Sequence, residues 1–272
     1  PPRDFFSAQP WTHAGAKEKI FPIVLEYRFK SEIRVQNAYL AAELADVTKI
    51  EFNGKQVPMN VAGKYVDDAI SKIALPEISR GENTLRLHVN YHSQSSAENV
   101  MILGDFFAEK QKIENGEKGV IAAKKAGLPW GRIDDLGYAF YGGNLTYVTK
   151  INVKHGGWLA IKAPCYKGNL IEIAVDGQKK GKILYAPYKA DLGKISAGAH
   201  ELRLTLYGNR FNTFGQLHNT TAVPWDGTYA WRTDGKEWSY DLLTRPVGIM
   251  RAPTYEIYAA ENSTERGGKE EK

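Results

Sequence analysis

Aromatic and polar side chains that could bind a sugar gather in one stretch of the chain, residues 209–238. A sugar presents an apolar ring face and a rim of hydroxyl groups, so aromatic rings with amide, carboxylate and Arg neighbours suit it. Alternatively, the same rings pack this long segment onto its own sheet, or against a catalytic domain outside this chain. The candidate carbohydrate contacts are Asn209, Arg210, His218, Trp225, Tyr229, Trp231 and Trp238.

Acidic residues could support hydrolysis of a glycosidic bond, which needs two carboxyl groups about 5 to 10 Å apart, one of them protonated. Adjacent Asp residues in a loop are usually solvated turn formers, and we interpret Asp134 and Asp135 in this way. The sequence has no Gly-x-Ser-x-Gly elbow, no His-Glu-x-x-His motif and no phosphate-binding loop. We therefore predict no catalytic residue. The other acids considered are Asp226, Asp234 and Glu237.

Histidine and cysteine offer no metal-binding pattern. The six histidines are scattered, and the closest useful pair, His88 and His92, falls on a predicted strand, where a spacing of four does not create a shared helical face. The single cysteine, Cys165, forms no intrachain disulfide and no thiolate zinc cage. We expect Cys165 to be a small, half-buried residue near the end of a strand, and we predict no cofactor.

Composition narrows the class of protein further. The 272 residues are 43% hydrophobic and 25% charged, which suits a globular chain with a sizeable core. The net charge of +5 is mild and its basic residues are dispersed, so we expect no nucleic-acid partner. No run of eighteen apolar residues suggests a membrane span. The opening Pro1-Pro2-Arg3-Asp4, without Met or a signal-peptide pattern, suggests a piece of a longer protein, and the compartment stays unknown.

The elements that must position these residues are predicted to be β-strands. Much of the order of strands and turns along the chain occurs twice. An apolar strand leads into Asn53-Gly54 in the first half and into Asp176-Gly177 in the second, 123 residues later. Such pairs predict type I′ hairpin turns, because Asn, Asp and Gly tolerate positive φ. Alternating strands follow Gly81 and, 117 residues later, Gly198. A period of about 120 residues matches one β-domain.

The fold class predicted is all-β, as two tandem jelly-roll β-sandwiches. Upstream of the turns, Tyr27-Arg28-Phe29 and Tyr147-Val148-Thr149 are expected to match at a spacing of 120 residues. Val100 to Leu103 is expected to supply the closing strand of the first sandwich. The predicted organisation is a lead-in segment (1–20), the first jelly roll (21–108), a linker with a hairpin excursion at Asn115-Gly116 (109–136), the second jelly roll (137–260) and a charged tail (261–272).

Several of these strings resemble the galactose-binding-domain-like jelly roll, and more narrowly the sugar-binding modules of family 2-type and α-L-rhamnosidase-like glycoside hydrolases. The resemblance rests on Val175-Asp176-Gly177-Gln178, on Pro187-Tyr188-Lys189-Ala190-Asp191, on Leu103-Gly104-Asp105-Phe106, and on the opening of the second module at 137–147. The sequence departs from the family pattern at Asp176, where Asn is commoner, and at Lys64-Tyr65, which replaces Pro-Tyr in the first copy.

This resemblance implies a non-catalytic accessory region, from the C-terminal part of a glycoside hydrolase-like protein, that braces the catalytic domain of its parent chain. It also implies that carbohydrate is a possible partner and that a structural Ca²⁺ can occur, although the sequence does not place one. A free-standing carbohydrate-binding or adhesion protein is the alternative. A glycosidase in its own right is a further alternative, and a close pair of carboxylates in a cleft would favour it.

Overall fold

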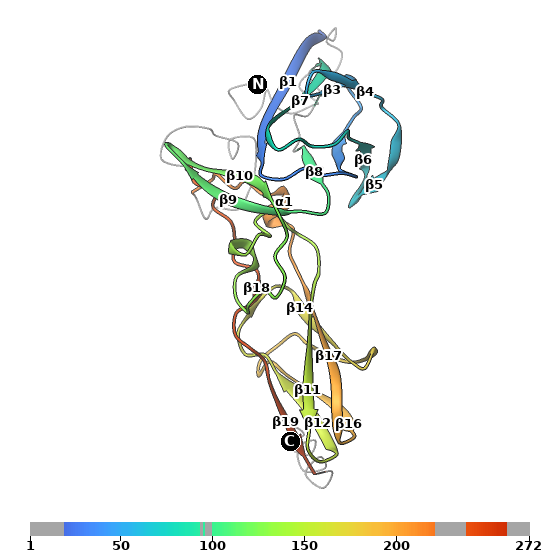
Figure 1. The fold of residues 1–272 in the computed structure, drawn as a ribbon, viewed down its shortest axis with the longest axis vertical. Helices are drawn as coiled ribbons and strands as arrows, with labels where there is room; N and C mark the ends of the chain where they lie inside the picture. Colours follow the sequence, from blue (N-terminus) through green and yellow to red (C-terminus); the bar gives the residue numbers. More distant parts are fainter. Residues whose placement is uncertain (1–18, 93–94, 96–99, 221–237, 260–272) are drawn as a thin grey trace, which may run out of the picture. The chain divides into compact units, whose positions relative to one another are not determined.

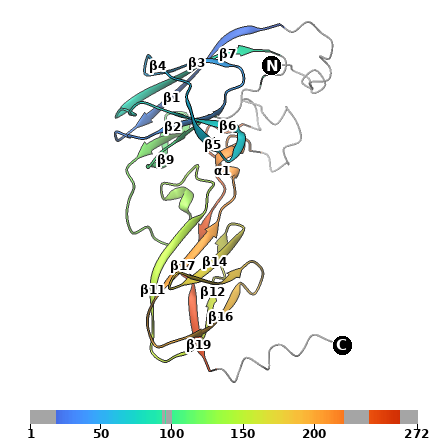
Figure 2. The ribbon, with the colours of Figure 1, turned by 90° about the vertical axis from the view of Figure 1, so that its right-hand side faces the viewer.

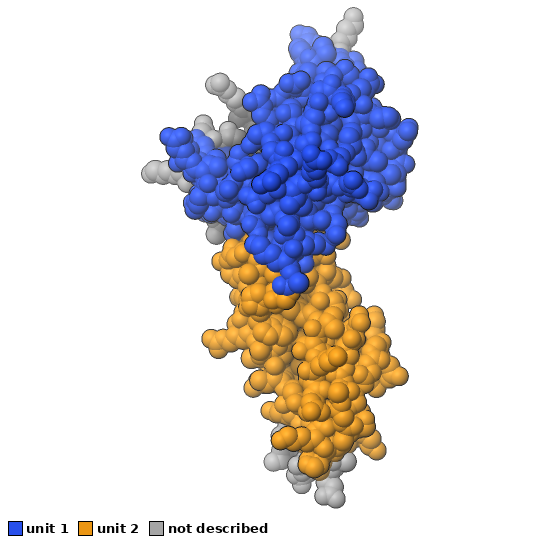
Figure 3. Space-filling model, in the orientation of Figure 1, with its two compact units in different colours: residues 1–126, 137–139, 216–243 blue, residues 127–136, 140–215, 244–272 orange. Residues whose placement is uncertain are grey.

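The computed structural model describes residues 19–92, 95, 100–220 and 238–259 (Figure 1). The regular secondary structure of the described chain is almost entirely β-strand, with a single α-helical turn, α1 (Phe211–Phe214), and a 3-10 turn, η2 (Ile133–Asp135). The predicted all-β fold is therefore confirmed. The chain divides into two compact units (Figure 3): unit 1 contains residues 1–126, 137–139 and 216–243, and unit 2 contains residues 127–136, 140–215 and 244–272.

Unit 1 is a sandwich of two sheets, with β3, β4 and β7 in one layer and β2, β5 and β6 in the other (Figure 2). The larger sheet has the order β4-β3-β7-β1-β10-β9 and the smaller has the order β5-β6-β2-β8. The strands are β1 (Phe21–Ser31), β2 (Tyr39–Glu43), β3 (Val47–Phe52), β4 (Lys55–Val57), β5 (Val61–Tyr65), β6 (Asp67–Ala74), β7 (Gly81–Tyr91), β8 (Met101–Leu103), β9 (Phe107–Ile113) and β10 (Gly116–Ala122).

Alternation along the strands builds the core between these sheets. In β7 every second side chain from Asn83 to Val89 is buried, because successive side chains of a strand point to opposite faces. Leu85 from the larger sheet joins one cluster with Leu40 and Ile73 from the smaller sheet, and all three are at most 1% exposed. Two sheets that pack face to face around one buried hydrophobic core form a β-sandwich, and unit 1 has this arrangement.

Unit 2 has a four-stranded sheet of order β11-β17-β14-β15, a three-stranded sheet of order β16-β12-β19 and a two-stranded ribbon, β13-β18. Gly181 of β15 lies so close to the Leu192 side chain of β16 that a Cβ would meet it at 2.8 Å, so the two larger sheets share a tightly packed layer. The strands are β11 (Leu145–Val153), β12 (Gly157–Lys162), β13 (Tyr166–Lys167), β14 (Leu170–Val175), β15 (Gln178–Ile183), β16 (Lys189–Ile195), β17 (Gly198–Tyr207), β18 (Gly248–Ile249) and β19 (Thr254–Tyr258).

The two units repeat the strand order that the sequence pattern indicates. The order β4-β3-β7-β1 in unit 1 corresponds to β15-β14-β17-β11 in unit 2. Both predicted type I′ turns are confirmed, since φ is 49° and 76° at Asn53 and Gly54, and 48° and 79° at Asp176 and Gly177. The turn side chains also bond alike: Asn53 Oδ1 accepts from the Thr84 N–H at 2.8 Å, and Asp176 Oδ1 accepts from the Glu201 N–H at 2.9 Å.

The expected match between Tyr27 and Tyr147 is wrong by two residues. Tyr147 lies opposite Leu204 of β17, which corresponds to Leu87 of β7, and Leu87 lies opposite Leu25. Tyr147 therefore occupies the place of Leu25. A shift of two residues keeps every side chain on its own face of the sheet, so an alternating pattern alone does not detect it.

Residues 109–136, predicted as a linker, include most of the hairpin β9–β10, which turns at Asn115-Gly116 as expected. Strand β10 pairs in parallel with β1 at Lys30 and Ser31, so this hairpin follows β8 within unit 1. Strand β9 is an edge strand, and its charged side chains protect that edge from pairing with another chain. Because most side chains of β9 are polar or charged, its sequence lacks the alternation of apolar and polar residues that predicts a strand.

The interpretation of Asp134 as a solvated turn former is wrong. Asp134 is 1% exposed, although its neighbour Asp135 keeps a 47% exposed side chain. Asp134 accepts hydrogen bonds from the Arg132 guanidinium at 2.5 Å and the Thr244 hydroxyl at 3.0 Å. It also accepts a longer one, at 3.4 Å, from the Val247 N–H. The carboxylate thus links two segments of unit 2 that are more than a hundred residues apart in the chain.

Candidate functional site

The structure places the predicted carbohydrate contacts in three groups. Trp225, Tyr229 and Trp231 lie outside the described residues. His218 and Trp238 belong to unit 1, and the remaining two residues, Asn209 and Arg210, belong to unit 2. Only His218 and Trp238 are brought together among the described members of the set.

His218 and Trp238 form a stacked pair with ring centroids 4.5 Å apart and an interplanar angle of 23°. The backbone supports this stack, because Asn219 and Trp238 form an antiparallel bridge and the Ser239 N–H donates to the His218 carbonyl at 2.7 Å. His218 Nδ1 lies 2.8 Å from the Ser239 carbonyl oxygen, which accepts its proton in the matching tautomer. Both rings are half-buried, so each of them keeps only part of its surface open to solvent.

Asn209 and Arg210 have a local structural role. The Asn209 side-chain oxygen accepts from the Phe211 N–H at 3.0 Å, and the Arg210 carbonyl accepts from the Thr213 and Phe214 N–H groups. These bonds start the helical turn α1, in the manner of an Asx turn. This arrangement accounts for the Asn209 side chain without a ligand, whereas Arg210 takes part through its backbone carbonyl.

The chain after Trp238 runs along the tip of the β9–β10 hairpin. The Glu117 N–H donates to the Tyr240 carbonyl at 3.0 Å, and Glu117 Oε2 accepts from the Leu242 N–H at 3.1 Å. Gly116 has a φ of 116°, and a Cβ at this position would overlap the Tyr240 carbonyl. Only glycine permits both this conformation and this close approach.

Lys112 of β9 holds the same segment by charge. Its Nζ lies 3.2 Å from Glu117 Oε1 and 3.1 Å from Asp241 Oδ1, bridging the hairpin and the 238–241 segment. Hydrogen bonds to Asp241, and then to Glu117, raise the pKa of Lys112, so the ammonium form is favoured. The Lys112 side chain is 70% exposed, and the Glu117 side chain, at 16%, is the most protected of the three.

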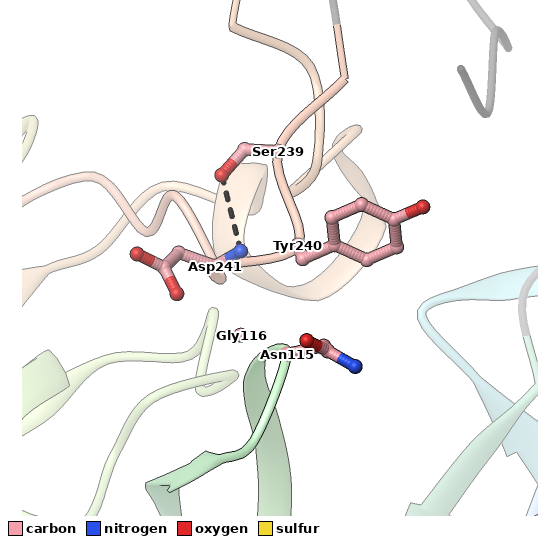
Figure 4. A pocket seen from close by; sticks show the side chains of 5 residues that line it. All are labelled: Asn115, Gly116, Ser239, Tyr240 and Asp241. Carbon is pink, nitrogen blue, oxygen red and sulfur yellow. Dashed lines mark hydrogen bonds between the residues drawn. The ribbon is translucent and has the colours of Figure 1, made fainter. Parts of the chain in front are cut away.

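Asn115, Gly116, Ser239, Tyr240 and Asp241 line an open depression of about 520 Å³ at this place (Figure 4). The Tyr240 ring and the Asn115 amide project to the same side, whereas the Asp241 carboxylate projects to the other side. Ser239 Oγ accepts from the Asp241 N–H at 3.0 Å and fixes the turn between them. We call these five residues, with Lys112, Glu117 and Trp238, the Tyr240 surface.

The Tyr240 surface offers the two kinds of contact that a sugar requires. The Tyr240 ring is 66% exposed and meets the Trp238 ring edge-on, with centroids 6.4 Å apart, so a supported aromatic face is open to a ligand. Asn115 provides an amide, and Asp241 provides carboxylate oxygens that accept hydrogen bonds from hydroxyl groups. An aromatic face beside a few polar groups in a depression is a common design of small-ligand sites.

Glu117 and Asp241 also form a close carboxylate pair. Since both contact one Lys112 Nζ, their nearest oxygens lie at most about 6 Å apart, which is close enough to compare with the carboxyl pair of a glycosidase. A glycosidase, however, needs one of its two groups to deliver a proton to the leaving oxygen. Here both carboxylates act as acceptors for one ammonium group, and Glu117 also accepts from a backbone N–H. This geometry suits an ion-paired scaffold.

The described ranges contain neither a metal-binding cluster of side chains nor a membrane-spanning helix. Within them, no group of three or more His, Cys, Asp or Glu side chains is arranged to hold a metal ion. His88 lies 3.6 Å from Glu51, and His92 lies 3.1 Å from Asp46. The helical segments of the same ranges are too short to cross a bilayer.

Comparison with known proteins gives little. No protein-family model matches the chain, and no curated protein matches it. Among solved structures, the chain is similar to a rhamnosidase from Novosphingobium sp. PP1Y, at 16% identity and a TM-score of 0.34, over 89% of this chain and 24% of that one. An anti-sigma factor domain-containing protein matches at 12% identity and a TM-score of 0.20, over 69% of this chain and 76% of that one. The chain thus spans about a quarter of the rhamnosidase, and scores this low establish neither family nor activity.

Most residues of the Tyr240 surface were not predicted from the sequence. Tyr240 and Asp241 follow the predicted segment by only two and three residues, so a slightly longer window includes them. Asn115-Gly116 gave a hairpin signal but no functional one. Lys112 and Glu117 gave no signal, because their partners in the segment 240–242 lie more than 120 residues away in the chain.

Proposed function

We propose that this chain is a non-catalytic β-sandwich region of a glycoside hydrolase-like protein and that it binds carbohydrate through the Tyr240 surface of unit 1. The observation that carries the proposal is the exposed Tyr240 ring, which stands on Trp238 and borders one depression with Asn115 and Asp241. The face of an exposed aromatic ring contacts water instead of other apolar groups. A sugar that places its apolar ring face on the aromatic ring provides those packing contacts.

The alternative, that these rings serve only as packing, applies to some of the residues. The Trp238–His218 stack is half-buried and has a backbone frame, so part of its role is structural. Tyr240 differs, because its ring stays largely exposed within unit 1. The role of unit 2 in this proposal is to brace the catalytic domain of the parent chain, which is the role that the family resemblance implies.

We also propose that the two units arose from one sandwich by duplication. The shared strand order and the equivalent turn hydrogen bonds at Asn53 and Asp176 support this idea.

A glycan-array screen tests the proposed function. The wild-type chain is expected to bind one class of sugar in a saturable way, and Tyr240→Ala is expected to lose that binding. Tyr185→Ala is the matched control, since Tyr185 is also a strongly exposed tyrosine, at 80%, but belongs to unit 2. Silence of the wild type across a broad array would overturn the carbohydrate-binding proposal. Release of reducing sugar by the chain would overturn its non-catalytic part.

A further inference from the structure

We infer that the Tyr240 surface selects uncharged saccharides and disfavours those that carry carboxylate or sulfate groups. This inference rests on the proposed function and adds the chemical class of the ligand. It follows from the charges at the depression and from the hydrogen-bond partners that these charges already have.

Among the described residues at the depression, negative charges predominate. Asp241 is the one charged residue among the five that line it. Glu117 adds a second carboxylate, and the exposed Glu114 precedes Asn115 at the hairpin tip. Against these acids stands Lys112, whose single positive charge leaves the Asp241–Glu117–Lys112 group with a net charge of −1.

The cation and three of the backbone N–H groups at the depression are already engaged. The Lys112 ammonium bonds two carboxylates, so an anionic ligand would have to compete with Asp241 or Glu117 for it. The backbone N–H groups of Glu117, Asp241 and Leu242 donate to Tyr240, Ser239 and Glu117, respectively. Further along the hairpin, Lys118 lies 3.9 Å from Glu82. These contacts leave the depression rich in acceptors, which suits hydroxyl groups.

The expected size of the discrimination follows from Coulomb's law. A like charge placed about 4 Å from the excess carboxylate in a water-like medium weakens binding about fivefold. Because the depression is open to solvent, the effect should shrink at high ionic strength, where the screening length falls to about 3 Å at 1 M salt.

The test uses three pairs of oligosaccharides whose sugar units have the same ring configuration and differ only at C6, which is neutral in one member and charged in the other. The units are galactose and galacturonic acid, glucose and glucuronic acid, and mannose and mannuronic acid. Calorimetric titration at low salt gives the ratio of affinities for the neutral and acidic members. We expect the neutral member of at least one pair to bind about fivefold more tightly. The methyl ester of the acidic member keeps the ring and removes the charge, and it should bind like the neutral sugar.

Asp241→Asn is expected to bring that ratio towards one, and Asp68→Asn is the control, because Asp68 is an exposed acid in the other sheet of unit 1. Thermal melting checks that both variants fold. Equal or tighter binding of the acidic member would overturn the inference and leave the proposed function standing. Absence of binding by every member of the three pairs, together with a silent array, would overturn the proposed function itself.

Discussion

Asp134 and Asp135 are adjacent residues of one type, but the first is buried and the second is exposed. Substituting each with Ala therefore tests how burial changes the contribution of a carboxylate to the free energy of unfolding. Asp134→Ala removes the acceptor of the Arg132, Thr244 and Val247 bonds from a site that is 1% exposed. Asp135→Ala removes an ion pair to Arg132 at 3.1 Å, from a side chain that is 47% exposed. The two variants lose the same atoms from very different surroundings.

The expected magnitudes follow from what each substitution leaves behind. Removing one partner of a fully buried ion pair costs about 3 to 5 kcal/mol. Arg132 is 41% exposed and keeps Asp135 as a partner, which lowers the cost, whereas the hydrogen bonds from the Thr244 hydroxyl and the Val247 N–H to the carboxylate are lost. We therefore expect Asp134→Ala to lower the free energy of unfolding by about 3 kcal/mol. Asp135→Ala should cost less than about 1 kcal/mol.

Urea unfolding followed by tryptophan fluorescence measures both variants. Because unit 2 contains Trp130 and Trp158, its transition is visible by this probe. A loss of about 3 kcal/mol corresponds to a midpoint shift of roughly 1 to 3 M urea at the usual slopes for small domains. Equal midpoints for the two variants would refute the argument, since they would show that the buried bonds of Asp134 add nothing beyond a surface ion pair.

The pH dependence of the same site provides a second readout. Burial alone would raise the pKa of Asp134, but the hydrogen bonds from Arg132 and Thr244, with the charge of Arg132, outweigh it and lower the pKa below 3.8. A carboxyl whose pKa is lower in the folded state stabilises the fold above its unfolded pKa, and this stabilisation is lost as the pH falls through the folded value. Asp134→Ala should therefore flatten the acid side of the stability curve.

Three further substitutions test other parts of the account. Gly177→Val places a β-branched residue at a φ of 79° and should lower the free energy of unfolding by about 1 to 3 kcal/mol in urea; an unchanged midpoint would contradict the type I′ turn. Gly116→Ala forces its Cβ against the Tyr240 carbonyl and should weaken sugar binding, whereas Gly127→Ala, at a φ of 66° with open space around it, should leave binding intact in the same titration. The wild type should become less stable as the pH rises through the raised pKa of His200, and His200→Asn should not show this decrease. Melting temperatures measured from pH 5 to 9 test this expectation, and the same pH dependence in both proteins would contradict it.

His200 occupies the place in unit 2 that Asn83 occupies in unit 1. In unit 1, Asn53 bonds Asn83, whose amide also donates to the Ser79 carbonyl. At the equivalent place in unit 2, Asp176 lies 2.7 Å from His200 Nδ1, and the Ser196 carbonyl lies 3.0 Å from Nε2. Both ring nitrogens face acceptors, an arrangement that only the protonated imidazole satisfies.

The direction of the His200 effect is set by its pKa. The hydrogen bond to Asp176, followed by that to Ser196, raises the pKa of His200 above its ordinary value of 6.5. A group whose pKa is raised in the folded state stabilises the fold fully below the unfolded pKa, and the stabilisation disappears as the pH rises through the folded pKa. The amide network of unit 1 does not titrate, so unit 1 should lack this dependence.

Local patterns predicted much of the fold. The Asn53-Gly54 and Asp176-Gly177 turns were predictable because the required backbone conformation admits few residue types. The strands after Gly81 and Gly198 were predictable because each alternates between a buried and an exposed face. The all-β class follows from such features, since each depends on residues close together in the chain.

Pairing between distant segments was beyond local patterns. The burial of Asp134 depends on Thr244 and Val247, and the segment around it looks like any polar turn. The position of Tyr240 depends on Gly116 and on the Lys112 bridge to Asp241, which join residues far apart in the chain. The two-residue error at Tyr147 arose because alternation repeats every second residue and leaves register open.

The most direct test of the central claim is a calorimetric titration of the wild type and the Tyr240→Ala and Tyr185→Ala variants with the strongest ligand from the array. Saturable binding is predicted for the wild type and for Tyr185→Ala, with a loss of roughly 5- to 150-fold in Tyr240→Ala, if a sugar ring gains on an aromatic face about the 1 to 3 kcal/mol that a nucleic-acid base gains there. All three proteins should share one melting temperature within a few degrees. Unchanged affinity in Tyr240→Ala would contradict the claim that this surface binds carbohydrate.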